Sequence, residues 1–189
     1  MSGPAADAGS GEGLARAYLA DAAARFASLR ELAERAMAQT DDDAFFASLD
    51  AESNSIAVIA KHVGGNLRSR FTDFLTTDGE KPDRQRDAEF ESSRGEARAD
   101  VEARWRAGWG ALEGTLASLR PDDLLRTVSI RGEPMTVVQA LSRATAHVAQ
   151  HVGQIVLLAK HAAGPGWQTL SIPRGASAAA IAARDPRRL

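Results

Sequence analysis

Hydrophobic residues recur every three or four positions through four long segments of this chain. The segments run roughly from Leu14 to Ala38, Glu52 to Thr76, Ala97 to Leu119 and Thr136 to Ala163. This period places the apolar side chains of each segment on one face of an α-helix and leaves polar side chains on the other. Four amphipathic helices of this length predict an all-α, four-helix bundle in which the apolar faces meet.

The polar segment of residues 77–96 separates the second and third predicted helices. Its twenty residues can extend to about 65 Å, whereas a helix spanning Glu52 to Thr76 is only about 37 Å long. This long link can therefore cross the whole length of the bundle, so the second and third helices need not be antiparallel neighbours.

Shorter elements are expected around these helices. Residues 126–135 alternate in polarity and turn at Gly132, which predicts a small hairpin. Residues 1–12 are expected to be a disordered leader, and residues 13–163 the bundle. The C-terminal tail, residues 164–189, carries apolar residues around Trp167, so we expect it to pack on the bundle, with one or two helical turns near Ser177–Ala183.

Composition narrows the range of functions. The net charge of −2 provides no large basic field, so nucleic acid is not an expected partner. No apolar run approaches 18 residues, and the start lacks the charged and apolar regions of a signal peptide, so we expect a cytoplasmic protein with no membrane span. The absence of cysteine excludes disulfides, thiolate metal ligands and a cysteine nucleophile.

Three of the four histidines can meet at one point. His147 and His151 lie four residues apart in the fourth predicted helix, which places them on the same face, one turn apart. His62 lies in the second helix, also at the margin between apolar and polar faces. Three neutral imidazoles can bind a divalent metal and leave positions open for water or substrate. His161 lies about four turns beyond His147 and is expected to be a solvated residue.

A structural interpretation of these residues competes with the metal site. A histidine at such a margin is usually a half-buried surface residue, and the His-x-x-x-His spacing also occurs by chance. Asn66 and Arg143 lie beside the histidines and are candidates to bind substrate, or are solvated side chains. Arg174 lies in the tail between a proline and a glycine, where its guanidinium can hold a carboxylate or phosphate, unless the tail only caps an apolar patch or reaches a dimer partner.

The chain resembles the DinB/YfiT-like superfamily of metalloenzymes over about residues 14–163. The resemblance is carried by the segments of residues 54–66, 86–90 and 143–155, and the residues 167–177 are similar to a bacterial subgroup catalogued as a domain of unknown function. It implies an up-down-down-up bundle with a metal bound by His62, His147 and His151. Many relatives are homodimers, and characterised ones include transferases and isomerases that use bacillithiol, mycothiol or glutathione with a divalent metal.

Two interpretations of function remain open at this stage. One is an enzyme that uses a divalent transition metal (zinc, nickel or iron) to activate a water or a low-molecular-weight thiol, as a thiol-dependent S-transferase or isomerase, or as a hydrolase acting on a small molecule. The catalytic group would then be the activated water or thiol, since no protein acid or base is identifiable. The other is a non-catalytic metal-binding or stress-response protein. We also expect a homodimer, because Trp109, Phe45 and Phe46 exceed the apolar needs of one bundle.

Overall fold

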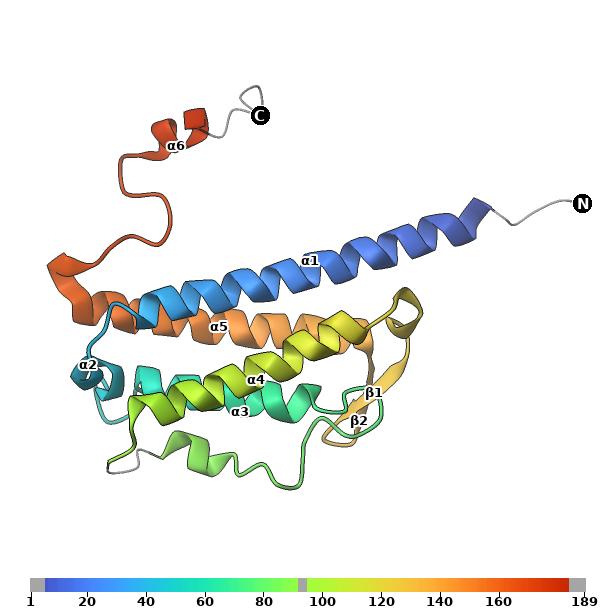
Figure 1. Cartoon of the computed structure of the whole chain (residues 1–189), viewed down its shortest axis with the longest axis horizontal. Coiled ribbons are helices and arrows are strands. Elements are labelled where there is room, and N and C mark those ends of the chain that lie inside the picture. Colours follow the sequence, from blue (N-terminus) through green and yellow to red (C-terminus); the bar gives the residue numbers. More distant parts are fainter. Residues whose placement is uncertain (1–5, 92–94, 184–189) are drawn as a thin grey trace, which may run out of the picture.

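The computed structural model describes residues 6–91 and 95–183, which are mostly helical with one small two-stranded sheet (Figure 1). The helices are α1 (Ala6–Met37), α2 (Asp42–Phe46), α3 (Ile56–Phe71), α4 (Arg98–Ser118), α5 (Val137–Ala163) and α6 (Ser177–Ala183), with three short 3-10 turns at Asp87–Phe90, Pro121–Asp123 and Gly164–Gly166. Strands β1 (Thr127–Ile130) and β2 (Glu133–Thr136) pair antiparallel around a turn at Gly132, as the hairpin prediction required.

Local hydrogen bonds decide where the helices begin. The second predicted helix was expected from Glu52, but α3 begins at Ile56 because the Asp50 carboxylate accepts the backbone N–H of Glu52 and of Ser53. The Ser55 hydroxyl then accepts the N–H of Val58 and caps α3. A serine or an aspartate at such positions satisfies backbone donors that a helix start leaves free. The polar residues before α3 therefore form a turn.

Helices α3 and α4 run in the same direction and pack closely. Early in α3, Lys61 pairs with Glu96 just before α4, and at the end of α3 the Phe71 carbonyl accepts a hydrogen bond from Thr115. Between these points Gly108 lies directly against the backbone of Gly64. Small residues allow this approach, so Gly64 and Gly108 mark a close contact between the two helices.

Helices α1 and α5 run together, opposite to α3 and α4 (Figure 1). The Tyr18 hydroxyl, in the first half of α1, donates to the carbonyl of Val138 at the start of α5 at 3.2 Å. The side chain of Gln39 bonds the backbone of Gln168 beyond the ends of both helices. Trp105 of α4 donates its indole N–H to a carboxylate of α1. The four long helices therefore enclose one core.

The aromatic side chains are used within a single chain. Trp109 and Phe45 are fully buried, and Phe46 packs partly buried against the same core. The expectation that these three residues form a surplus for a dimer interface is therefore wrong, because the core of one chain buries two of them and packs against the third. Homodimerisation itself stays a prediction.

The polar link between α3 and α4 returns along α3. The Asp78 carboxylate holds its start against the hairpin, where it accepts hydrogen bonds from Ser129 and from the backbone N–H groups of Arg131 and Gly132. At its far end Lys61 donates to the Glu91 carbonyl at 2.6 Å. The link thus runs back along the length of α3, which its own length made feasible, and lies across the face of that helix.

The chain ends differ from the sequence expectations. Helix α1 begins at Ala6, so residues 6–12 are helical where a disordered leader was expected; residues 1–5 lie outside the described residues. Trp167 and Leu170 pack against the core, whereas the residues after them are mainly exposed and α6 buries none. The tail therefore packs through its first residues. Within the described ranges, no helix is both long and apolar enough to span a membrane.

Candidate metal centre

Three histidines converge between α3 and α5. His62 projects from α3, and His147 and His151 project from successive turns of α5; one ligand atom from each lies within 4.8 Å of the others. The Nε2 atoms of His62 and His147 are 3.2 Å apart. Two zinc–nitrogen bonds of about 2.1 Å at a tetrahedral angle would hold their nitrogens about 3.4 Å apart. The spacing of His62 and His147 therefore fits a shared divalent ion, and His151 lies close enough to be its third ligand.

His62 is oriented by a carboxylate from the link. Its Nδ1 lies 2.9 Å from Oε2 of Glu89. The two oxygens of the Glu89 carboxylate each accept a hydrogen bond of 2.8 Å from the Arg84 guanidinium. Burial opposes ionisation of Glu89, but the hydrogen bonds from His62 and Arg84 outweigh it and lower the pKa of this carboxyl. An ionised Glu89 accepts a hydrogen bond from the Nδ1–H of His62, which leaves the Nε2 lone pair of His62 facing the other histidines.

His151 is oriented in the same manner from its own helix. Its Nδ1 lies 2.8 Å from the side-chain oxygen of Gln154, three residues further along α5. An amide oxygen accepts a hydrogen bond, so Nδ1 carries the proton and Nε2 is free. Burial, aided by the nearby His62, outweighs the opposing effect of the Gln154 hydrogen bond and lowers the pKa of His151, so the ring is neutral near pH 7. Two of the three imidazoles thus have a partner that selects the ligating tautomer.

His147 is held neutral by its surroundings. Burial, followed by the adjacent His151 and His62, lowers the pKa of His147 to about 4. Its Nδ1 is buried and, within the described residues, has no hydrogen-bond partner. Metal binding requires neutral imidazoles, and protons compete with the metal for them. His147 is therefore ready to accept a metal at neutral pH without first losing a proton.

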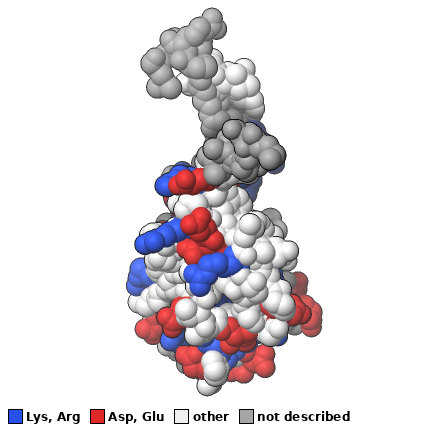
Figure 2. Space-filling model, turned by 90° about the vertical axis from the view of Figure 1, so that its right-hand side faces the viewer, with Lys and Arg blue, Asp and Glu red and all other residues white. Residues whose placement is uncertain are grey.

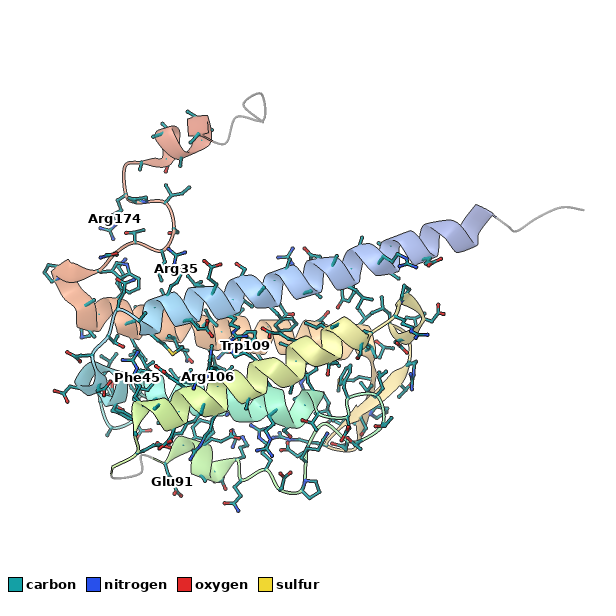
Figure 3. All side chains as sticks on the ribbon, viewed as in Figure 1. Arg35, Phe45, Glu91, Arg106, Trp109 and Arg174 are labelled. Carbon is teal, nitrogen blue, oxygen red and sulfur yellow. The ribbon has the colours of Figure 1, made fainter. Side chains whose placement is uncertain are left out.

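A cavity of about 190 Å³ opens beside His62 and His147. Asn66 and Arg143, both expected to bind substrate, line it from α3 and α5, one turn beyond the histidines. Arg174 does not line the cavity and is carried by the exposed part of the tail (Figure 3). The structure therefore brings together two of the three expected substrate-binding residues and leaves the third apart.

The structure adds two residues to the site that were not among the expected ones. Glu89 and Arg84 come from the link, which the hydrophobic pattern marked only as polar. A signal for Glu89 was present, because it lies within the segment of residues 86–90 that carries the resemblance to a known superfamily. His161, in contrast, is exposed near the end of α5, as expected.

A second cavity, of about 510 Å³, lies on the other side of the Arg84 and Glu89 pair. Gly65, Lys61 and Arg104 are among its lining residues, whereas the three histidines are not. Arg84 lines both cavities and so stands in the wall between them. The chemistry of the histidines is accessible from the smaller cavity.

Comparison with known proteins identifies one match. A family model described as "Protein of unknown function (DUF1572)" matches residues 13–176, which contain all three histidines and both residues of the Arg84 and Glu89 pair. No curated protein and no solved structure matches the chain significantly.

Proposed function

The chain belongs to the DUF1572 family of proteins of unknown function, and from that premise we propose that it is an enzyme dependent on a divalent transition metal bound by His62, His147 and His151. One observation carries the proposal: the three imidazoles converge while Glu89 and Gln154 hold the opposite nitrogens of two of them. Metal-binding histidines usually donate their second N–H to such partners. Zinc, nickel and iron all suit imidazole ligands.

We also propose that the four long helices form the up-down-down-up bundle of the DinB/YfiT-like superfamily. The directions of the helices support this arrangement, since α1 and α5 run opposite to α3 and α4. The positions of the histidines on α3 and α5 agree with the resemblance found in the sequence. An experimental structure with α3 antiparallel to α4 would contradict it.

The proposed chemistry is the activation of a nucleophile for a small substrate. A divalent metal on three imidazoles lowers the pKa of a bound water or thiol, which makes either one reactive near neutral pH. The chain contains no cysteine, so a thiol would have to come from a low-molecular-weight compound. In the proposed enzyme, Glu89 keeps His62 in its ligating tautomer, and the cavity with Asn66 and Arg143 holds the substrate. A thiol-dependent S-transferase or isomerase is the specific reaction type that we propose.

Metal content tests the first part of this proposal. The chain would be stripped with a chelator, reloaded with zinc, nickel or iron, and analysed as wild type and as His62→Ala, His147→Ala, His151→Ala and His161→Ala variants. We expect one metal per chain in the wild type and in the His161→Ala control, and a large loss of affinity in the other three. Unchanged metal content in His147→Ala and His151→Ala would contradict the site.

A turnover screen of the metal-loaded protein tests the second part. It would combine bacillithiol, mycothiol or glutathione with small electrophiles, and would include simple esters and amides without thiol. Turnover that needs both metal and thiol supports a transferase or isomerase, whereas thiol-independent hydrolysis would replace it with a hydrolase. Stoichiometric metal without turnover of any substrate class would favour a non-catalytic metal-binding protein.

A further inference from the structure

The cavity beside the histidines is lined mainly by cationic and apolar side chains. Its polar lining, apart from His62, His147 and Asn66, consists of the five arginines Arg70, Arg84, Arg86, Arg131 and Arg143. They come from α3, the link, the hairpin and α5. Among the described residues that line the cavity, none carries a carboxylate.

Partly buried carboxylates outside the cavity neutralise part of this charge. Glu80 accepts hydrogen bonds from Arg70 at 3.0 Å and from Arg131 at 2.7 Å, and Arg84 is paired with Glu89. Hydrogen bonds from Arg131 and Arg70 outweigh the effect of burial and lower the pKa of Glu80, so it is ionised. Three guanidinium groups thus share two carboxylates as hydrogen-bond partners, and neither carboxylate lines the cavity. The nearby Asp78 carboxylate accepts a hydrogen bond from the backbone N–H of Arg131.

The remaining two arginines are only loosely paired with carboxylates. The side chains of Arg86 and Arg143 are 50% and 52% exposed, and their nearest carboxylates, Asp87 and Glu133, lie 3.7 and 3.8 Å away. In the described part of the chain, neither guanidinium donates a hydrogen bond to a carboxylate. Arg86 also lies over the ring of Phe90, 5.0 Å from its centroid, which limits the directions it can take.

This concentration of positive charge is found at the cavity and is not a general property of the chain. The net charge of the chain is −2, and acidic and basic side chains are interspersed on the face of the molecule seen in Figure 2. A cavity lined by guanidinium groups and by no carboxylate favours an anionic ligand, because the carboxylates that partly compensate these groups lie outside its lining. The arrangement therefore indicates that the ligand carries a negative charge.

We propose that this cavity binds a carboxylate or phosphate group of a small anionic substrate, held by Arg143 and Arg86, with its reacting end at the histidines. The assignment of the reacting end rests on the proposed function; the binding of the anion does not. A guanidinium can donate two parallel hydrogen bonds to either group. A volume of about 190 Å³ equals roughly six water molecules at about 30 Å³ each. The substrate is accordingly a small organic acid or phosphate ester.

Calorimetric titration with two anions tests the proposal. Inorganic phosphate and succinate would be titrated separately, at low ionic strength, into the metal-loaded full-length chain and into the chelator-treated chain. The variants are Arg143→Gln and Arg86→Gln. Arg106→Gln is the matched control, because Arg106 is 58% exposed, has its nearest carboxylate at 3.7 Å and lies on α4 outside the cavity.

We expect at least one anion to bind with a stoichiometry of one, and to bind about tenfold or more weakly to each cavity variant, while the control equals the wild type. Preference between the two titrants tells whether the group is a carboxylate or a phosphate. No binding of either anion, an equal loss in Arg106→Gln, or binding that needs only the metal and ignores both arginines would overturn the proposal.

Metal content measured on the same samples separates this proposal from the proposed function. Arginine-dependent anion binding by a chain that takes up no metal would support the anion site and contradict the metal-dependent enzyme. Stoichiometric metal in a chain that binds neither anion would support the metal site and contradict the anion site.

Discussion

Glu89 occupies the space that a side chain at position 65 would need. A Cβ added at Gly65 would collide with the carboxylate of Glu89, and the same carboxylate holds Nδ1 of His62 at 2.9 Å. The colliding atoms are the far end of a flexible side chain. An added methyl group would therefore displace the carboxylate and leave the backbone of α3 in place.

The Gly65→Ala variant is expected to keep its fold and bind metal more weakly. Displacement of Glu89 frees the His62 ring, and loss of such a partner typically weakens metal binding by about 10–100-fold. Zinc affinity in competition with a chelator measures this change. Gly114→Ala on α4 is the control, because a Cβ there meets nothing within 4 Å. Equal affinity in the two variants would contradict the role of Gly65.

The Glu89→Gln variant separates the charge of this group from its shape. The amide keeps the volume but loses the ionised acceptor for His62 and the ion pair with Arg84. We expect a fall in zinc affinity of about tenfold or more. Glu91→Gln, two residues along the same link and exposed (Figure 3), should bind zinc like the wild type. A comparable fall in both variants would point to a general electrostatic effect of the link.

The Gly108→Ala variant is expected to destabilise the fold. A Cβ at this position would collide with the backbone of Gly64, which cannot turn aside as a side chain can. Separating α3 from α4 should lower the free energy of unfolding by about 1–3 kcal/mol, or the melting temperature by several degrees. Gly114→Ala on the same helix again serves as control. Equal stability of the two variants would argue against the close contact.

The stability of the metal-free protein should depend on pH through His147. Its pKa is about 4 in the folded chain against an ordinary value of 6.5. Between these values the unfolded chain binds the proton and the folded chain does not, so the free energy of unfolding falls as pH drops from 6.5 to about 4. Urea unfolding would measure the free energy of unfolding at several pH values across this range. That free energy should depend less steeply on pH in His147→Gln than in the wild type, and equally steeply in His161→Gln. Identical slopes for wild type and His147→Gln would refute the assignment.

The Lys61 and Glu96 ion pair should be strongly coupled. The two side chains are 2% and 7% exposed and lie 2.8 Å apart. Removal of one partner from such a buried pair costs about 3–5 kcal/mol, although Arg104 at 3.2 Å still partly compensates Glu96. We expect Lys61→Met to be more destabilising than the double variant Lys61→Met/Glu96→Gln. Additive effects in this double-mutant cycle would show that the pair contributes no coupling.

The sequence determined the features that depend on local geometry. The apolar period located four long helices, and their observed ends differ by only a few residues at most termini, apart from α1 and α3. The proximity of His147 and His151 follows from a spacing of four residues in one helix. Local hydrogen bonds that the side chains of Asp50 and Ser55 accept from the backbone shifted the start of α3, and no apolar pattern reports such bonds.

Contacts between distant segments were decided by the tertiary structure alone. Only the packing of α3 against α5 brings His62 to His147, 85 residues away, and only the return of the link along α3 brings Glu89 to His62. The same holds for the five arginines, which four separate elements contribute to one cavity. In the sequence, each of these residues resembles a solvated surface residue. A local pattern tells which side of its own helix a residue occupies, but not which distant segment packs against that side.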